Sequence, residues 1–268
     1  MIHLTPQSNF SWLAEIDTVA TDVDGTLTDS NGEFTSGLVD AFLTCQRHGI
    51  RVILVTGRPA SWVQGMVEYF PVAGGIGENG GLYCPKLREA PMRLLMTEAD
   101  ELPEISLDYV EKTSAERRRV FDLIRQRYPR LRPTGDCVTR LTDFTFPLDG
   151  LSSEDLVIIN SICADNGWGF TYSSIHGHIK DPRQHKASGI LRTIELVPEL
   201  KTIPTKVVTV GDSRNDQEMF DPKHFPHSVG VANIARHLPN MEIKPSYVTV
   251  SPGVEGFREL IHALVKGR

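Results

Sequence analysis

The hydrophobic pattern at the start of the chain predicts a parallel sheet with intervening helices. Residues 18–23 and 51–55 are short, apolar and rich in β-branched side chains, which is typical of strands buried on both faces. Apolar positions then recur at helical spacing over residues 36–48, up to Gly49, and over residues 60–69. This β-α-β-α order predicts parallel strands joined by right-handed crossovers.

The same pattern returns toward the other end of the chain. Residues 206–210 and 227–232 predict two further buried strands, and residues 187–196 predict a helix. The stretch between, about 85–183, differs: helices are predicted at 114–128 and 153–166, and the alternating run 137–142 predicts a strand. We interpret this stretch as an α+β module inserted into the parallel sheet. The basic run 117–119 predicts a solvated helix face, with a substrate-facing patch as the alternative.

Composition narrows the classes of function. The 268 residues carry a formal net charge of −6, which argues against a surface that holds nucleic acid. The four cysteines are scattered without a C-x-x-C pair, so we expect neither a zinc knuckle nor a disulfide scaffold, and a reducing cytoplasm fits best. The sequence predicts neither export nor membrane insertion, and we expect a monomer or homodimer.

The first candidate motif, Asp22-Val23-Asp24-Gly25-Thr26, lies at the carboxyl end of a predicted strand, where open α/β sheets bind ligands. Its two acids can converge on one site only if the strand ends between them, and Gly25 permits that turn. A phosphate monoester repels an anionic nucleophile, so this chemistry implies a cation, Mg²⁺. Asp22 would then attack phosphorus, and Asp24 would act as general acid and base. An acidic turn between strand and helix is the alternative.

Two further polar turns also follow predicted strands. Thr56 and Gly57 offer a hydroxyl and a backbone N–H, a small cradle for an anion, although such turns are also common helix caps. In the turn 211–216, Asp212 is the natural Mg²⁺ ligand and Asp216 would orient the metal shell. Asn215 could contact the phosphate or that shell. An Asx-rich turn that caps a helix is the alternative here.

A lysine completes the candidate chemistry. Lys186 lies at the start of the predicted helix 187–196, where a positive charge is unfavourable to the helix dipole. Contact with a phosphate dianion and with Asp22 would explain its position. Lys180 and Arg183 are nearby alternatives, and the residues alone leave the choice open.

Together these motifs resemble the four ordered motifs of the haloacid dehalogenase superfamily, over nearly the whole chain. The long insertion between Thr56 and Lys186, preceded by the stretch 78–81 (Glu-Asn-Gly-Gly), is similar to the Cof-type branch with an α/β cap. The spacing from Ile179 to Lys186 is similar to that branch's return from cap to core, which favours Lys186 among the lysine alternatives. The stretch 183–185 (Arg-Gln-His) departs from the family's usual Gly-hydrophobic turn.

The resemblance implies a Rossmann-like, doubly wound core (residues 1–85 and 184–268) and an inserted α+β cap (residues 86–183). It implies Asp22 as nucleophile and metal ligand, Asp24 as acid/base that also binds metal through its carbonyl, and Asp212 as metal ligand, with Asp216 in the outer shell. The phosphoryl group would be held by Thr56, Gly57, Lys186 and Asn215.

The function that follows is a Mg²⁺-dependent phosphatase for a small phosphorylated metabolite, with sugar phosphates expected. A phosphomannomutase-like phosphomutase is the alternative enzyme, although its last motif differs from residues 211–216, and a catalytically silent metabolite-binding protein is a third hypothesis. Substrate identity should reside in the cap and hinge. Our candidates there are Arg58, Glu78, Asn79, His176 and His178, with the segment 173–178 facing the substrate; strand histidines without a ligand role are the alternative.

Overall fold

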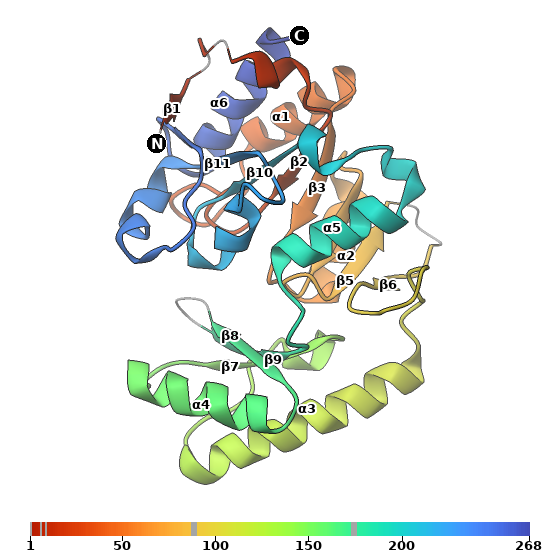
Figure 1. Cartoon of the computed structure of the whole chain (residues 1–268), viewed down its shortest axis with the longest axis vertical. Helices are drawn as coiled ribbons and strands as arrows, with labels where there is room; N and C mark the ends of the chain where they lie inside the picture. The colour runs from red at the N-terminus through yellow and green to blue at the C-terminus, as the bar shows by residue number, and fades with distance from the viewer. Residues whose placement is uncertain (1, 6, 9, 87–89, 173–175) are drawn as a thin grey trace.

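Two separate sheets organise the chain (Figure 1). The structure is a computed structural model that describes residues 2–5, 7–8, 10–86, 90–172 and 176–268. Among these residues the larger sheet has the order β1-β12-β11-β10-β2-β3-β4-β5-β6. Its strands are β1 (Ile2–Leu4), β12 (Tyr247–Thr249), β11 (His227–Gly230), β10 (Val207–Gly211), β2 (Thr18–Thr21), β3 (Arg51–Val55), β4 (Gly74–Gly77), β5 (Leu82–Pro85) and β6 (Arg93–Leu94).

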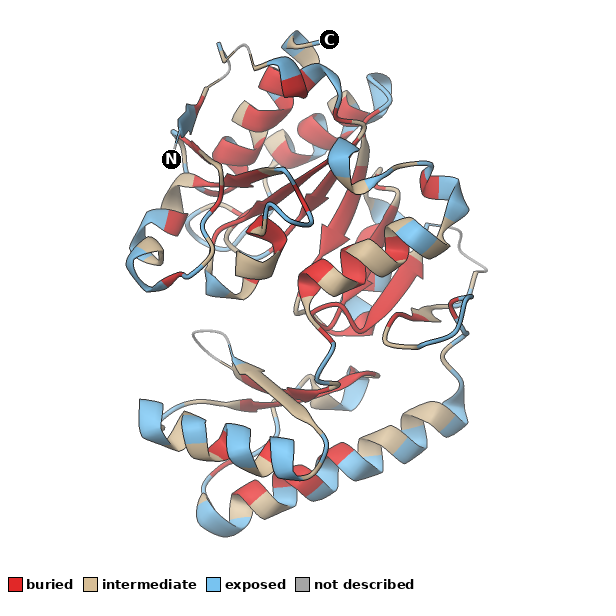
Figure 2. Cartoon of the chain, viewed as in Figure 1, coloured by how far each residue is buried: buried red, intermediate tan, exposed pale blue. Residues whose placement is uncertain are grey.

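Neighbouring strands from β1 to β4 run parallel, and β5 and β6 are antiparallel additions at one edge. Helices cover both faces. On one face α1 (Ser36–Arg47), α2 (Ala60–Tyr69) and α6 (Gly253–Lys266) bury Phe42, Val63 and Phe257, and on the other α5 (Lys186–Leu196) buries Ile190. Strands covered on both sides are buried throughout, as Figure 2 shows for the centre of this sheet, which explains their continuous apolar runs.

The smaller layer, the cap, is an antiparallel sheet backed by two helices. Its strands lie in the order β7 (Asp143–Pro147), β9 (His176–Lys180) and β8 (Gly169–Tyr172). Helices α3 (Leu107–Arg127) and α4 (Ser153–Asp165) pack on the sheet through Phe121, Phe146 and Ile159. Figure 1 shows both helices on the side away from the core, so the other face of the cap sheet is directed at the core. The predicted fold class, a doubly wound core with an inserted α+β module, is confirmed.

The prediction of a strand over 137–142 is wrong. Residues 137–139 form a short 3-10 helix, η2 (Cys137–Thr139), and β7 begins only at Asp143. The alternation has another cause: the side chains of Arg140 and Thr142 are buried, while the N–H groups of Leu141 and Thr142 donate to the carboxylate of Glu78 instead of to a neighbouring strand. A period of two in burial therefore arose here without strand pairing.

The prediction of a solvated basic face is wrong for its first residue. Arg118 and Arg119 are exposed, but Arg117 is buried and donates from Nη2 to the carbonyl of Leu141 at 2.9 Å. Its guanidinium also lies over the ring of Trp168, 5.4 Å from the ring centre. Arg117 thus supports the cap segment that follows η2.

The predicted domain boundaries differ from the described elements at one place. Strand β6 pairs with β5 of the core sheet, and Leu95 and Leu102 are buried in the same apolar cluster as Ile190. This stretch was predicted to belong to the cap. It packs with the core, and the cap helices begin afterwards with α3, whose first turn is capped by Ser106.

Candidate active site

Parallel strands bring the predicted motifs to one edge of the core sheet. β2 pairs in register with β10 on one side and with β3 on the other, so that Thr21 lies beside Val210 and Leu54. The residues that follow these three strands, Asp22, Asp212 and Thr56, therefore meet at the same edge. Lys186 does not follow a strand of this sheet: it is the first residue of α5.

The carboxylates of Asp22, Asp212 and Asp216 form a buried group, the carboxylate cluster. Each offers one oxygen, and these oxygens all lie within 4.8 Å of one another. Nζ of Lys186 donates to Asp22 Oδ1 and to Asp216 Oδ1, both at 2.5 Å. Burial alone would lower the pKa of Lys186, but the charges of Asp216 and Asp22 outweigh it and raise that pKa. Lys186 is thus a permanent cation here, and of the three competing basic residues it is the one that the structure brings to Asp22.

The donor set of the cluster fits a divalent cation that prefers oxygen. Three carboxylates face one buried ammonium, so negative charge exceeds positive charge in the cluster. The exposed guanidinium of Arg236 also lies 3.5 Å from Asp212. Burial, followed by repulsion from Asp216, raises the pKa of Asp212 to about 7. Hard oxygen ligands and unbalanced negative charge are the properties of sites for Mg²⁺ and Ca²⁺.

Asp216 lies closer to the centre than the outer-shell position predicted for it. One of its oxygens accepts from Lys186, and the other accepts from the backbone N–H groups of Asp212 and Ser213, both at 3.0 Å. Asp216 therefore shapes the turn that carries Asp212 and also contributes to the cluster. Asn215, predicted to contact phosphate, accepts a hydrogen bond from the hydroxyl of Ser213.

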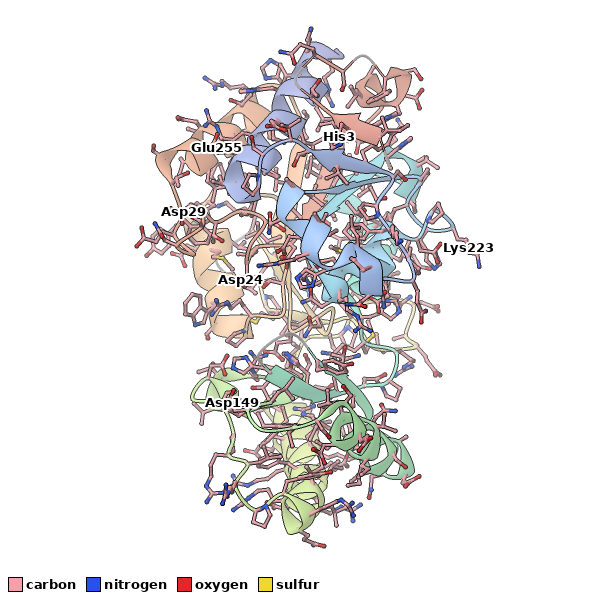
Figure 3. All side chains as sticks on the ribbon, turned by 90° about the vertical axis from the view of Figure 1, so that its left-hand side faces the viewer. His3, Asp24, Asp29, Asp149, Lys223 and Glu255 are labelled. Atoms are coloured by element: carbon pink, nitrogen blue, oxygen red, sulfur yellow. The ribbon has the colours of Figure 1, made fainter. Side chains whose placement is uncertain are left out.

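Asp24 is separate from the carboxylate cluster. Its oxygens accept from Nε of Arg58 at 2.9 Å and from Nη2 at 2.5 Å, a bidentate pair. Both side chains are accessible, 49% for Asp24 and 41% for Arg58, and Figure 3 shows Asp24 in the part of the core nearer the cap. Gly25 makes the turn directly after Asp24 possible: its φ is +81°, and a Cβ there would lie 2.5 Å from Asp212 Oδ2.

The predicted cap and hinge residues lie at the junction between the two sheets. Glu78 is buried, and its carboxylate accepts from the backbone of Ala60 and of residues 141–143. His178 is also buried, with Nδ1 2.8 Å from Asp143 and 3.4 Å from Asn79. Burial, followed by the charge of His178, lowers the pKa of the half-buried His176. Residues 173–175 of the predicted substrate segment lie outside the described residues.

Sequence reasoning missed Asn233, in the short 3-10 helix η6 (Ala232–Arg236). Its Nδ2 donates to Asp212 Oδ2 at 2.8 Å and to the carbonyl of Gly25 at 3.0 Å, and its Oδ1 accepts from Gly253 N at 3.0 Å. The side chain therefore orients a cluster carboxylate and joins the turn after β2 to the start of α6. A signal was present, because Asn233 follows a predicted strand just as the other motifs do.

The fold and the site define a class: α/β proteins with a buried carboxylate cluster at the edge of a parallel sheet and an inserted cap. Comparison with known proteins agrees. Residues 19–105 match the model of the haloacid dehalogenase-like hydrolase family. This match, together with the similar proteins below, supports the predicted family, a Cof-type member of the haloacid dehalogenase superfamily.

Relatives with similar sequences extend along most of the chain. A phosphoglycolate phosphatase of Methanothrix thermoacetophila is 28% identical over 92% of this chain and 96% of that protein. One from Methanoculleus marisnigri is 26% identical over 83% and 85%. The predicted enzyme class, a hydrolase of phosphoric monoesters, is confirmed.

Solved structures share the fold. A Thermoplasma acidophilum protein superposes with a TM-score of 0.68 at 18% identity, over 93% of this chain and 98% of that one. The sucrose-phosphatase of Synechocystis, solved with sucrose and phosphate, has a TM-score of 0.64 at 17% identity, over 92% and 97%. None of the helices in the described ranges combines the length and apolar character needed to cross a membrane.

Proposed function

We propose that this protein is a Mg²⁺-dependent phosphatase that hydrolyses a small phosphorylated metabolite through an aspartyl-phosphate intermediate on Asp22. The observation that carries the proposal is the shared ammonium of Lys186, 2.5 Å from Asp22 and from Asp216, beside Asp212. A buried cation held against a carboxylate at the end of a central strand suits an anionic substrate that must approach an anionic nucleophile.

Each residue has a defined task in this proposal. Asp22, Asp212 and Asp216 would hold Mg²⁺, which would supply the charge neutralisation that lets the phosphate ester approach. Lys186 and the turn at Thr56 and Gly57 would bind the phosphoryl oxygens while Asp22 attacks phosphorus. Asn215 remains a proposed phosphate contact.

Asp24 would protonate the leaving oxygen and later take a proton from the water that hydrolyses the intermediate. Both of its oxygens accept from Arg58, so this pair must loosen before Asp24 can reach the leaving oxygen. Arg58 would then be free to contact the substrate, as we predicted from the sequence.

The substrate class is tested by phosphate release from a panel of esters with Mg²⁺ or with EDTA. The panel pairs sugar phosphates, expected from the sequence, with 2-phosphoglycolate, which the names of the relatives suggest. Asp22→Asn should abolish release. Asp29→Asn is the matched control, since Asp29 lies on the same segment and accepts only local backbone hydrogen bonds among those described.

Equal release by wild type and Asp22→Asn would refute the nucleophile assignment. Release that persists unchanged in EDTA would refute the metal. The mutase alternative predicts isomerisation of a hexose 1-phosphate with its bisphosphate activator and no free phosphate. The silent binding protein predicts saturable binding of an ester without turnover of it.

A further inference from the structure

The backbone carbonyls of residues 56–58, the Thr56 turn, are all occupied. The carbonyl of Thr56 accepts from Asn79 N at 3.0 Å, and that of Arg58 accepts from Glu78 N at 3.0 Å. The middle carbonyl, that of Gly57, accepts from Nη1 of Arg140 at 3.0 Å. Two of the three donors thus belong to the core, and the third is a side chain of the cap, 83 residues away in the sequence.

The bond from Arg140 controls more than one oxygen. A peptide group is planar and trans, so its C=O and N–H point in opposite directions. Holding the carbonyl of Gly57 therefore fixes the N–H of Arg58, which donates to the hydroxyl oxygen of Thr56 at 3.1 Å. Through this one peptide plane, Arg140 sets the position of the hydroxyl that we propose as a phosphate ligand.

Arg140 is itself held firmly. It is only 6% exposed. Its Nη1 also donates to the two oxygens of Asp143 at 3.0 and 3.1 Å, and its Nη2 donates to Asp136 at 2.8 Å. Burial would raise the pKa of Asp143, but Arg140 and then His178 outweigh it and lower that pKa. The guanidinium is therefore a fixed, permanently charged donor that the cap presents to the core.

Glu78 joins the same two parts of the chain. Its carboxylate accepts from Leu141 N at 3.0 Å and from Thr142 N at 2.6 Å in the cap, and from Ala60 N at 3.0 Å at the start of α2. Ala60 lies two residues after the Thr56 turn. The cap segment 140–143 and the core segment 56–60 are consequently tied together at two points, by Arg140 and by Glu78.

The turn that carries Glu78 is built for this contact. Glu78, Asn79 and Gly80 all have positive φ, at 51°, 57° and 98°, a conformation that costs free energy for the two residues with side chains. A Cβ on Gly81 would lie 1.9 Å from Thr142 Oγ1, and one on Gly80 would lie 2.2 Å from the carbonyl of His185. Gly81 therefore permits the close approach of cap and core at this turn, and Gly80 permits the approach of the turn to the start of α5.

We propose that Arg140 is a positioning residue for phosphate binding. Because its guanidinium, a side chain of the cap, holds the carbonyl of Gly57, the affinity of the Thr56 turn for a phosphoryl group depends on the position of the cap. The inference rests on the proposed function, because it assigns that turn to the phosphate. Coupling of this kind is reciprocal, so a bound phosphoryl group also favours the position of the cap in which Arg140 contacts Gly57.

Two variants of Arg140 test the coupling. Arg140→Lys keeps the charge beside Asp143, so the fold is retained, but one ammonium cannot serve Asp143, Asp136 and the Gly57 carbonyl in the same geometry. Arg140→Met combined with Asp143→Asn removes the donor together with the charge of its fully buried partner, while the remaining partner, Asp136, keeps a side chain that is 30% exposed to solvent. The control is Arg132→Met, since Arg132 is an exposed cap arginine that donates to the carbonyls of residues 129 and 131 within the cap.

The probe is inorganic phosphate, titrated calorimetrically into each full-length protein with Mg²⁺, beside kcat and KM for the best ester and the melting temperature. We expect the double variant to weaken phosphate binding and raise KM about tenfold, the effect of one charge-assisted hydrogen bond. Arg140→Lys should fall between the double variant and wild type. Arg132→Met should match wild type.

Unchanged phosphate affinity in folded Arg140→Lys would overturn the inference, and so would an equal loss in Arg132→Met. If the double variant fails to fold, the lysine variant still decides. Wild type that neither hydrolyses esters nor binds phosphate would refute the proposed function and this inference together. Wild type that does both, with Arg140 variants that behave like it, would refute the inference alone.

Discussion

Replacing Lys186 with methionine would remove the ammonium group that bridges two carboxylates of the cluster. Lys186 is 1% exposed and lies 2.5 Å from both Asp22 and Asp216. Removing one partner from a buried ion pair leaves its counter-charge unpaired, which costs about 3–5 kcal/mol. We expect Lys186→Met to lose about that much free energy of unfolding without Mg²⁺, together with nearly all phosphatase activity.

The same geometry predicts that Mg²⁺ restores part of the lost stability. The variant keeps all three carboxylates but lacks the competing positive charge, so it should bind the cation more tightly than wild type. A ligand at 100 times its Kd stabilises a protein by about 2.7 kcal/mol. The gain in stability on adding Mg²⁺ should therefore be larger for Lys186→Met than for wild type.

Chemical denaturation with and without Mg²⁺ measures both effects. Lys180→Met is the matched control: Lys180 is buried like Lys186 but donates to the carbonyl of Gln184, and burial lowers the pKa of this lysine. Lys180→Met should lower the free energy of unfolding less than Lys186→Met does, and it should leave the gain in stability on adding Mg²⁺ as in wild type. Equal stability of Lys186→Met and wild type without Mg²⁺, or an equal Mg²⁺ gain in both, would refute the electrostatic reasoning.

Two further predictions concern the hinge. Gly81→Ala should lower the free energy of unfolding by roughly 1 kcal/mol or more, because the new Cβ would lie 1.9 Å from Thr142 Oγ1. The control is Gly65→Ala, whose Cβ would meet open space within α2; it should leave the melting temperature equal or higher. Burial and then Lys180 lower the pKa of His185 to about 4, and its Nδ1 accepts from Ser188 N. The neutral imidazole of His185 therefore adds about 1–2 kcal/mol to the free energy of unfolding, after allowance for solvent screening. This stabilisation is complete above the unfolded pKa of about 6.5 and is lost as the pH falls toward 4. His185→Asn should flatten the denaturation free energy between about pH 7 and pH 5 relative to wild type; identical slopes would contradict this.

The sequence was informative where local pattern and topology agree. Asp22, Thr56 and Asp212 follow buried strands, and parallel pairing alone brings such positions together. The contribution of Asp216 to the cluster depends on the path of one 3-10 turn, η5 (Arg214–Phe220), which spacing does not determine. The role of Arg140 could not be predicted, because the alternating pattern around it is also typical of a strand. Contacts between cap and core are set by tertiary packing, and so neither Arg140 nor the partners of Glu78 could be identified from local sequence.

The peptide that returns from the cap is short, and this limits where the chain can accept inserted residues. β9 ends at Lys180 and α5 begins at Lys186, so one inserted residue between them could displace the ammonium of Lys186 by up to about 3.5 Å. That displacement exceeds its 2.5 Å bond to Asp22. The exposed turn at Asp149 and Gly150 has no such constraint, since a Cβ on Gly150 would meet open space. Loop grafts that alter substrate choice should therefore tolerate lengthening at 149–150 and fail between 181 and 185.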